Sequence, residues 1–421
     1  MISEDSSWLK IDQAGRSVSI DSTDPRFFDD PYATYERIRA VMPAFFWEEH
    51  RLWCFLNAAD VGAILRDRRF GRELLPPPGQ PAAPTRSMPS HVEVFHAVNR
   101  DSMLEREPPV HTRLRTLVNR AFVSRSVERL RPRIAGLAHE LVDRVEPFRK
   151  TDLIQSFATP IPVVVIAELL GVPSEMAPQL LDWSHRMVAM FQLGRTREME
   201  DSAEAATKEF SSFLRQYVGE RRKRPADDLI THLLAAEAAD DRLSEDELIA
   251  TCILLLNAGH EATVHAIGNS VKTLLEERTN PVEAFAGDPA TEATVEECLR
   301  FDPPLHLFNR VVQEDVEVAG ISLPRGSEVA LLYGAANRDP ARYPRAQVFD
   351  PKRPLAGASF SHTAFGGGIH FCLGAPLARL ELQVSLPILF RRLPGLHLQG
   401  RPHYRDNYHF HGLQALDVGW G

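Results

Sequence analysis

The chain has 421 residues, of which 44% are hydrophobic, and 57 acidic against 48 basic side chains give it a formal charge of −9. This length and hydrophobic content suffice for a large buried core, and the acidic balance argues against a nucleic acid as a partner. No apolar run approaches about 18 residues, and the chain begins with acidic and serine residues rather than a basic and then apolar segment, so neither a membrane span nor export is expected.

The four cysteines have no paired spacing, so neither a disulfide framework nor a cysteine zinc site is predicted. Cys54, Cys252 and Cys298 lie in apolar or helical stretches and are interpreted as small buried hydrophobes. A reducing, cytoplasmic compartment fits this cysteine usage.

The N-terminal part of the chain mixes short helices and strands. Apolar spacing predicts a helix over 31–41, strands over 45–47 and 53–56, and a further helix ending at 65. Residues 71–109 contain eight prolines and little periodicity, which indicates a long loop of the kind that serves as a lid or binding loop.

Helical periodicity dominates from 110 to 300. A dense basic run at 221–224 closes one predicted helix and is interpreted as a solvated helix end. Ser244 and Glu247 fit a capping box that opens an unbroken helix over 244–277, expected to cross the core.

The C-terminal part changes to short alternating runs after Pro303. Strands are predicted over 310–318 and 328–332, followed by a glycine-rich loop at 366–368, a last helix from about 372 and a hairpin-like tail. The predicted fold is mainly α with a minor β part (α+β), in one domain over 1–421.

The glycine-rich loop contains the most informative cysteine. A cysteine that ligates a metal must be a thiolate, and Cys372 precedes a helix whose first turn holds Pro376, so unpaired N–H groups face the sulfur. A buried free cysteine in a glycine-rich turn is the alternative. However, the complete pattern Phe-x-x-Gly-x-x-x-Cys-x-Gly, formed by Phe365, Gly368, Cys372 and Gly374, closely resembles the haem-binding loop of cytochromes P-450. This resemblance implies that Cys372 ligates the iron of haem b.

The resemblance extends over nearly the whole chain, in the order of the family. Glu297 and Arg300 resemble the Glu-x-x-Arg helix, and Arg353 resembles the arginine with which that helix pairs. Residues three apart share a helix face, so Glu297 and Arg300 are expected to form an ion pair that Arg353 completes. By resemblance, the three residues support the fold and the haem pocket, and the expected fold is a haem-enclosing helical core with small sheets.

Four basic residues match the positions that hold the haem propionates in the family, namely His111, Arg115, Arg310 and His370. Each alone would ordinarily be a surface charge. Burial of two propionates requires cationic donors, and all four stand in the expected order.

The central helix resembles the oxygen-activating helix of the family. Ala258 and Gly259 are small where the helix passes over the porphyrin, and Glu261 fits the acid that delivers protons. Ala262 stands where the family usually has threonine, and Thr263 is expected to point about 100° away.

Three interpretations of Ala262 remain open. Substrate hydroxyls or ordered water complete the proton route, or the enzyme couples or dehydrogenates substrates without inserting oxygen. The third is poor oxygen activation or a peroxide-driven reaction. A metalloprotease is not predicted, because His260 and His265 lie about 140° apart on the helix and do not share one zinc ion.

The resemblance also suggests a substrate pocket and partners. The proposed lining residues are Met88, Val94, Met190, Phe191, Leu255, Ala258, His306, Leu307 and Phe410. Polar contacts are suggested for His306, His409 and His411. No flavin or iron–sulfur motif is found, so electrons are expected from NAD(P)H through a ferredoxin reductase and a ferredoxin. The candidate docking residues are Arg113, Arg379, Arg391 and Arg392.

The sequence thus predicts a haem-thiolate monooxygenase that uses O2 to oxidise a small, natural-product-like molecule. Oxidative coupling or desaturation by the same haem is the alternative reaction. A haem-containing binding or recruitment module with little turnover is the alternative of a different class.

Overall fold

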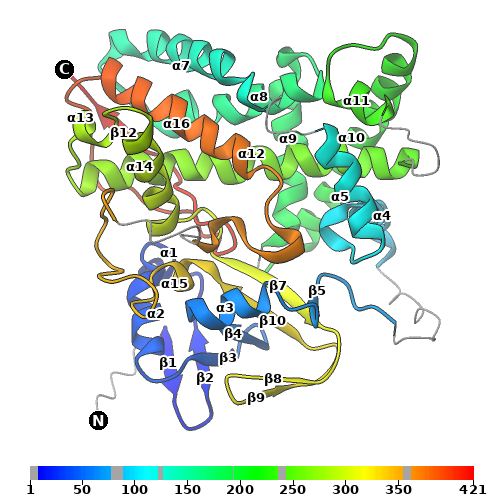
Figure 1. Cartoon of the computed structure of the whole chain (residues 1–421), viewed down its shortest axis with the longest axis vertical. Coiled ribbons are helices and arrows are strands. Elements are labelled where there is room, and N and C mark those ends of the chain that lie inside the picture. Colours follow the sequence, from blue (N-terminus) through cyan, green and yellow to red (C-terminus); the bar gives the residue numbers. More distant parts are fainter. Residues whose placement is uncertain (1–7, 77–88, 122–126, 193, 236–242, 354–361) are drawn as a thin grey trace.

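A computed structural model of the chain describes residues 8–76, 89–121, 127–192, 194–235, 243–353 and 362–421. Helices make up most of the molecule, and a sheet lies at one end beside the N-terminal segment (Figure 1). The fold is mainly α with a minor β part, as predicted. The helices are α1 (Pro25–Phe28), α2 (Pro31–Arg39), α3 (Ala58–Ile64), α4 (Glu93–Arg100), α5 (Val110–Ala121), α7 (Arg131–Val145), α8 (Pro160–Leu170), α9 (Ala177–Val188), α10 (Arg197–Lys223), α11 (Leu229–Ala235), α12 (Glu245–Glu276), α13 (Pro281–Ala284), α14 (Asp288–Phe301), α15 (Tyr333–Asn337) and α16 (Ala375–Arg392).

The strands form three sheets. Seven of them make the main sheet in the order β1-β2-β3-β4-β10-β7-β5, and the smaller sheets have the orders β11-β12-β6 and β8-β9. The strands are β1 (Leu9–Asp12), β2 (Ser17–Ile20), β3 (Ala44–Trp47), β4 (Leu52–Phe55), β5 (Phe70–Gly71), β6 (Lys150–Asp152), β7 (Leu307–Val312), β8 (Val316–Val318), β9 (Ile321–Leu323), β10 (Glu328–Leu332), β11 (His397–Leu398) and β12 (Asp417–Gly419).

Strand β10 joins distant parts of the chain. It pairs in parallel with β4 and antiparallel with β7. Its apolar residues are buried on both faces, with Val329 in one hydrophobic cluster and Ala330 in another, as expected for a central strand covered on both sides. The register sets Arg310 of β7 opposite Val329, which fixes the position of one predicted cofactor residue.

Helix α12 is the axis of the helical part (Figure 1) and lies against α8, α9, α10, α14 and α16. The predicted capping box is present, because the Glu247 N–H donates to Ser244 Oγ at 3.1 Å and the Ser244 N–H donates to Glu247 Oε2 at 2.9 Å. At 32 residues the helix is about 48 Å long, and most of its side chains are buried. Among the described residues, no helix combines the length and apolar character that a membrane crossing requires.

Several predicted elements are confirmed, and others need correction. The predicted strands 45–47, 53–56 and 328–332 correspond to β3, β4 and β10. The single strand expected over 310–318 is two strands, β7 and β8, and the last helix begins at Ala375, not near 372. The prediction of one long loop over 71–109 is wrong in part, because α4 occupies Glu93–Arg100. The apolar stripe of this short helix was too brief to indicate a helix among so many prolines.

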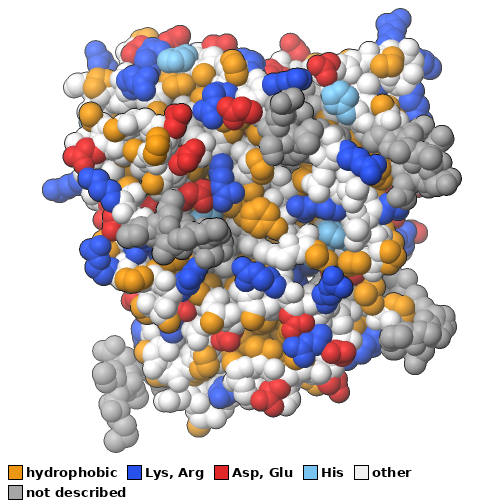
Figure 2. Space-filling view, in the orientation of Figure 1, with side chains coloured by type: hydrophobic (Ala, Val, Ile, Leu, Met, Phe, Trp, Pro, Cys, Tyr) orange, Lys and Arg blue, Asp and Glu red, His pale blue; other side chains and the backbone are white. Residues whose placement is uncertain are grey.

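The three cysteines interpreted as core residues, Cys54, Cys252 and Cys298, are buried. On the face shown in Figure 2, basic and acidic side chains are interspersed over much of the described surface.

A buried carboxylate at the end of α14 holds two arginines. Arg300 donates to Glu297 through Nη2 at 2.7 Å and Nε at 2.8 Å, and Arg353 donates through Nε at 3.2 Å. Arg300 also donates to the carbonyl oxygens of Asn337 and Ala346 at 2.8 and 3.0 Å. The predicted three-residue contact is therefore present, and it ties α14 to the segment that follows α15.

Replacing Glu297 by glutamine should destabilise the protein by about 3–5 kcal/mol, because two buried guanidinium groups lose their counter-charge. Urea unfolding followed by circular dichroism measures this loss. Glu283→Gln is the matched control, since the Glu283–Lys352 pair is exposed and screened by solvent, so its loss should leave the free energy of unfolding nearly unchanged. Equal effects of the two substitutions on stability would contradict a stabilising role for the buried Glu297 carboxylate.

Candidate active site

A cavity of about 400 Å³ lies among α12, α5, β7 and the loop before α16. Its walls are largely apolar, and it includes residues from segments far apart in the sequence. Three groups of predicted site residues line the cavity: residues of the cysteine loop, the basic residues and the small residues of the central helix.

The cysteine loop turns back on itself before α16. The Cys372 N–H donates to the carbonyl of Phe365 at 3.0 Å, and both residues line the cavity. Gly368 does not line it. With φ at +66°, a Cβ on Gly368 would lie 2.0 Å from the Leu65 carbonyl oxygen, so this glycine permits close packing of the loop on the residue after α3.

The Cys372 thiol is exposed to the cavity, whereas the other three cysteines are buried in the protein core. Because the cavity is walled by protein, burial raises the pKa of this thiol. Hydrogen bonds from the backbone N–H groups of Gly374 and Ala375 and the charge of Arg115 act in the opposite direction and favour the thiolate.

All four predicted propionate partners line the same cavity. Arg310 is 2% exposed, and Arg115 donates to the carbonyl of Phe371 at 2.7 Å. His111 and His370 lie with ring centroids 4.4 Å apart, and burial, followed by the charges of His370 and Arg115, lowers the pKa of His111 to about 4.

The charge balance at this edge of the cavity provides a test of whether haem fits. His370 meets Glu107 at 2.9 Å, but no described carboxylate lies within ion-pair distance of Arg115 or Arg310. Partly or fully buried guanidinium groups are costly without negative partners. The residues present therefore fit a planar group that carries two carboxylates and takes a thiolate ligand, as haem b does.

Helix α12 presents Ala258, Gly259, Ala262 and Thr263 to the cavity. Thr263, about 100° around the helix from Ala262, also lines the cavity, and its hydroxyl donates to the Gly259 carbonyl at 3.2 Å. A Cβ on Gly259 would lie 3.3 Å from Ile166, so this glycine also allows α8 to approach.

Glu261 does not line the cavity. Its carboxylate is 6% exposed and lies among histidines on the other side of α12, with His265 Nε2 at 3.2 Å and His185 Nε2 at 3.3 Å. Burial raises the pKa of Glu261, but the imidazole rings of His185, His260 and His265 around the carboxylate outweigh this effect and hold the pKa well below its usual range.

Besides Ala258, four of the proposed substrate-pocket residues line the cavity, namely Phe191, Leu255, Leu307 and Phe410. Met88 falls outside the described residues. Val94, Met190 and His306 do not line the cavity. Met190 is a core residue, and His306 is enclosed by Tyr32 and Tyr35, whose hydroxyls lie 3.2 and 3.0 Å from its ring nitrogens.

Neighbouring tail histidines face different surroundings. His409 lines the cavity and stacks on Phe191, and burial lowers its pKa to about 4, so its ring is neutral near pH 7. His411 instead stacks on Tyr404 at 3.6 Å and lies 3.4 Å from Asp302. Of the three histidines suggested for polar contacts with the substrate, only His409 therefore lines the cavity.

The cavity also contains residues that the sequence did not reveal. Arg72 contacts Glu105 at 2.5 Å, and its guanidinium lies over the Phe308 ring. Glu381 of α16 is 1% exposed, neither carboxyl oxygen has a hydrogen bond within the described part of the chain, and burial raises its pKa well above the usual range. An acid within the apolar run of α16 was the available signal for Glu381.

Three of the four arginines proposed for partner docking already pair within the chain. Arg113 pairs with Glu247, Arg379 with Glu296 at 2.6 Å, and Arg392 with Asp143 at 2.6 Å. Arg391 is exposed.

Comparison with known proteins agrees with this site. A model of the family described as Cytochrome P450 matches residues 83–281 and 269–400. The chain is 34% identical over 406 residues to the biotin biosynthesis cytochrome P450 of Bacillus subtilis (strain 168), covering 96% of this chain and 99% of that protein. It is 35% identical over 407 residues to the 6-deoxyerythronolide B hydroxylase of Saccharopolyspora erythraea, covering 94% and 93%.

Among solved structures, the chain resembles P450BioI in complex with an acyl carrier protein ligated to hexadec-9Z-enoic acid. The TM-score is 0.86 at 34% identity, covering 94% of this chain and 100% of that one. The chain therefore belongs to the cytochrome P450 family. It is an oxidoreductase of the monooxygenase type, in a family that implies haem and O2.

Replacing Arg310 or Arg115 by leucine should accelerate loss of haem by about tenfold or more, because each substitution removes a charge-assisted contact with a propionate. Transfer of haem from the loaded protein to excess apomyoglobin measures this rate. Arg120→Leu, on the exposed face of the same helix as Arg115, should leave the rate unchanged. Unaltered haem retention in both cavity variants would contradict the prediction that Arg310 and Arg115 hold the propionates.

Proposed function

We propose that this protein is a haem-thiolate monooxygenase in which Cys372 would supply the thiolate ligand of the haem b iron and His111, Arg115, Arg310 and His370 would hold the propionates. The supporting observation is that a thiol opening on the cavity shares that cavity with the buried Arg310 and the half-buried Arg115, neither of which has a carboxylate partner among the described residues. A small molecule with natural-product character is the proposed substrate, in line with the hydroxylase relative from Saccharopolyspora erythraea.

When bound, haem supplies the activation of O2 that allows oxygen to be inserted into the substrate. The chain supplies the surroundings of that reaction. The N–H groups of Gly374 and Ala375 stabilise the thiolate, and the small side chains of Ala258 and Gly259 leave space next to α12. Phe191, Leu255, Leu307 and Phe410 form an apolar wall that excludes water and favours a largely apolar ligand, beside which His409 offers one polar contact.

Proton delivery in this enzyme does not use a hydroxyl at position 262, because alanine is found there. Glu261 faces away from the cavity, and the Thr263 hydroxyl is engaged by the Gly259 carbonyl. A substrate hydroxyl or ordered water therefore carries protons to the reaction.

The proposed electron donors are a ferredoxin and its reductase, using NAD(P)H in the cytoplasm. Ile369 on the cysteine loop is 43% exposed, and Arg391 is exposed on α16. These residues offer an apolar and a cationic contact to an acidic ferredoxin, whereas the paired Arg113, Arg379 and Arg392 would have to exchange partners.

The Cys372→Ser variant tests the ligand assignment. The reduced, CO-treated wild type should show the red-shifted Soret band that identifies thiolate ligation, and the variant should lose that band while still binding haem. Arg115 and Arg310 remain to hold the haem, so loss of the band reports the sulfur specifically. A wild-type protein that binds haem without the red-shifted band would refute the proposal.

The Ala262→Thr variant tests the proton route. If the substrate supplies the hydroxyl, added threonine should change product formed per NADPH by less than about twofold, because the route is already complete. Coupled turnover with a substrate found by haem spin-state titration provides the measurement. A large gain in coupling would argue against delivery through the substrate.

Oxidative coupling or desaturation is the alternative reaction, and labelled O2 distinguishes it, since only oxygen insertion transfers the label to the product. A haem-containing recruitment module is the alternative of another class. Stable ligand binding without NADPH consumption would support that alternative.

A further inference from the structure

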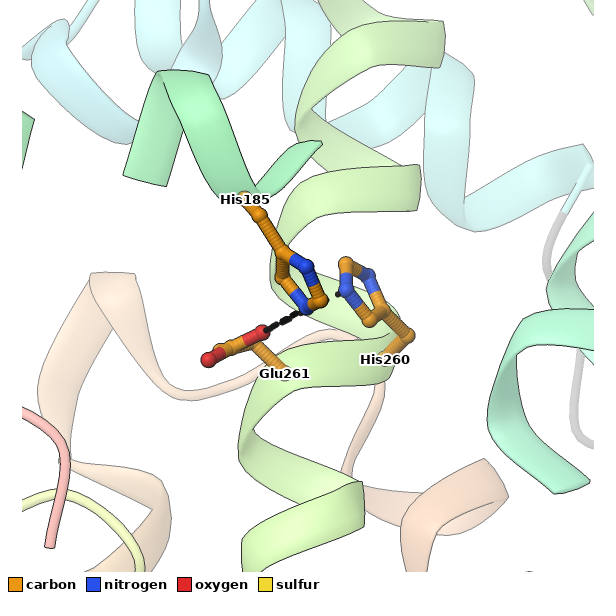
Figure 3. A group of neighbouring side chains, drawn as sticks. All are labelled: His185, His260 and Glu261. Atoms are coloured by element: carbon orange, nitrogen blue, oxygen red, sulfur yellow. Dashed lines mark ion pairs between the residues drawn. The ribbon is translucent and has the colours of Figure 1, made fainter. Parts of the chain in front are cut away.

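Two histidines and a glutamate meet outside the cavity, where α9 lies against α12 (Figure 3). His185 comes from α9, and His260 and Glu261 are consecutive on α12. Both Nε2 atoms approach the same carboxylate oxygen, Glu261 Oε2, at 3.3 Å from His185 and 3.4 Å from His260. All three ligand atoms lie within 4.8 Å of one another.

His260 is held in the orientation of a metal ligand. Its Nδ1 lies 2.9 Å from the Leu256 carbonyl, which accepts only, so Nδ1 carries the proton and donates. In the neutral ring, Nε2 then presents a lone pair toward Glu261. This nitrogen is buried, since His260 is 1% exposed, and it has no hydrogen bond among the described residues. A ring anchored through its second nitrogen to a backbone carbonyl is the usual arrangement for a histidine that binds metal.

The other side of the carboxylate is also fixed. His265 Nε2 lies 3.2 Å from Glu261 Oε1, and Arg405 Nη1 lies 3.9 Å from the same oxygen. Oε1 is therefore occupied by protein contacts, which leaves Oε2 facing the two histidines. His265 takes no part in the ligand set, in agreement with the angular argument from the sequence.

Two of the three ligand separations match a tetrahedral ion. Ligands about 2.0–2.1 Å from a zinc ion in tetrahedral geometry are about 3.3–3.4 Å apart. The two measured nitrogen–oxygen distances have this value, while a lone pair and a carboxylate oxygen facing each other without a proton or cation between them would repel.

We propose that His185, His260 and Glu261 form a binding site for a divalent transition-metal ion of the Zn²⁺ type, with water as the fourth ligand. Two imidazoles and one carboxylate are a zinc ligand set. The side chain of His185 is 49% exposed, which gives the ion and the water a path from solvent.

The ion would tie α9 to α12 beside the cavity. Met187 and Val188, two and three residues after His185 on α9, line the cavity. Metal binding would therefore restrain one wall of the ligand pocket without touching the haem. This inference does not depend on the proposed reaction, because binding of the ion is measured without turnover.

The test is calorimetric titration of ZnCl₂ into the haem-loaded enzyme after removal of metals with a chelator. The wild type should bind one equivalent, and His185→Gln should weaken binding at least tenfold, because one of three protein ligands is lost. His185 is half exposed, so this substitution should leave the fold and the haem spectrum intact. His260→Gln should weaken binding to the same extent.

His232→Gln is the matched control. His232 also has a side chain that is 49% exposed and lies 3.2 Å from one acidic residue, Asp227, but no third ligand joins them. This variant should bind Zn²⁺ as the wild type does. Absence of stoichiometric binding by the wild type, or binding unchanged in His185→Gln, would overturn the proposal.

Discussion

The carboxylate of Glu297 and the two arginines that surround it hold α14 against the end of α15 and the residues that follow it. Arg300 reaches the carbonyl groups of Asn337 and Ala346, and Arg353 reaches those of Pro344 and Val348. Residues 338–353, which follow α15, are thus held on α14 by these buried contacts rather than by regular secondary structure. Since α14 also lies against α12 and α16, the cavity keeps its shape only while these charges remain together.

The sequence was most informative where one residue type has one physical use. The capping box of Ser244 and Glu247 marked the start of α12, and the alternation over 328–332 matched β10. A cysteine and four basic residues stood in a family order, and all five line the one cavity. Each of these signals is local, or depends on an order that can be read along the chain.

Other features could not be read from the sequence, because they depend on which side of an element meets a neighbour. Phe410 lines the cavity while His411 faces Asp302, although the two are adjacent. His306 was expected in the pocket but serves a buried tyrosine network. The position of Thr263 depended on the width of the cavity, which helical angles alone do not give. Arg72 lacked any pattern that would separate it from ordinary surface charges, whereas Glu381 stands within the apolar run of α16.

The close contact between Gly368 and the carbonyl of Leu65 has a kinetic consequence. About 300 residues separate these two positions, so the cysteine loop acquires its final shape only after the N-terminal segment has docked. The same segment provides β4, which β10 needs as its parallel neighbour. Closure of the cavity is therefore a late, non-local event of folding, and a chain still being synthesised has no complete site in which to retain its haem.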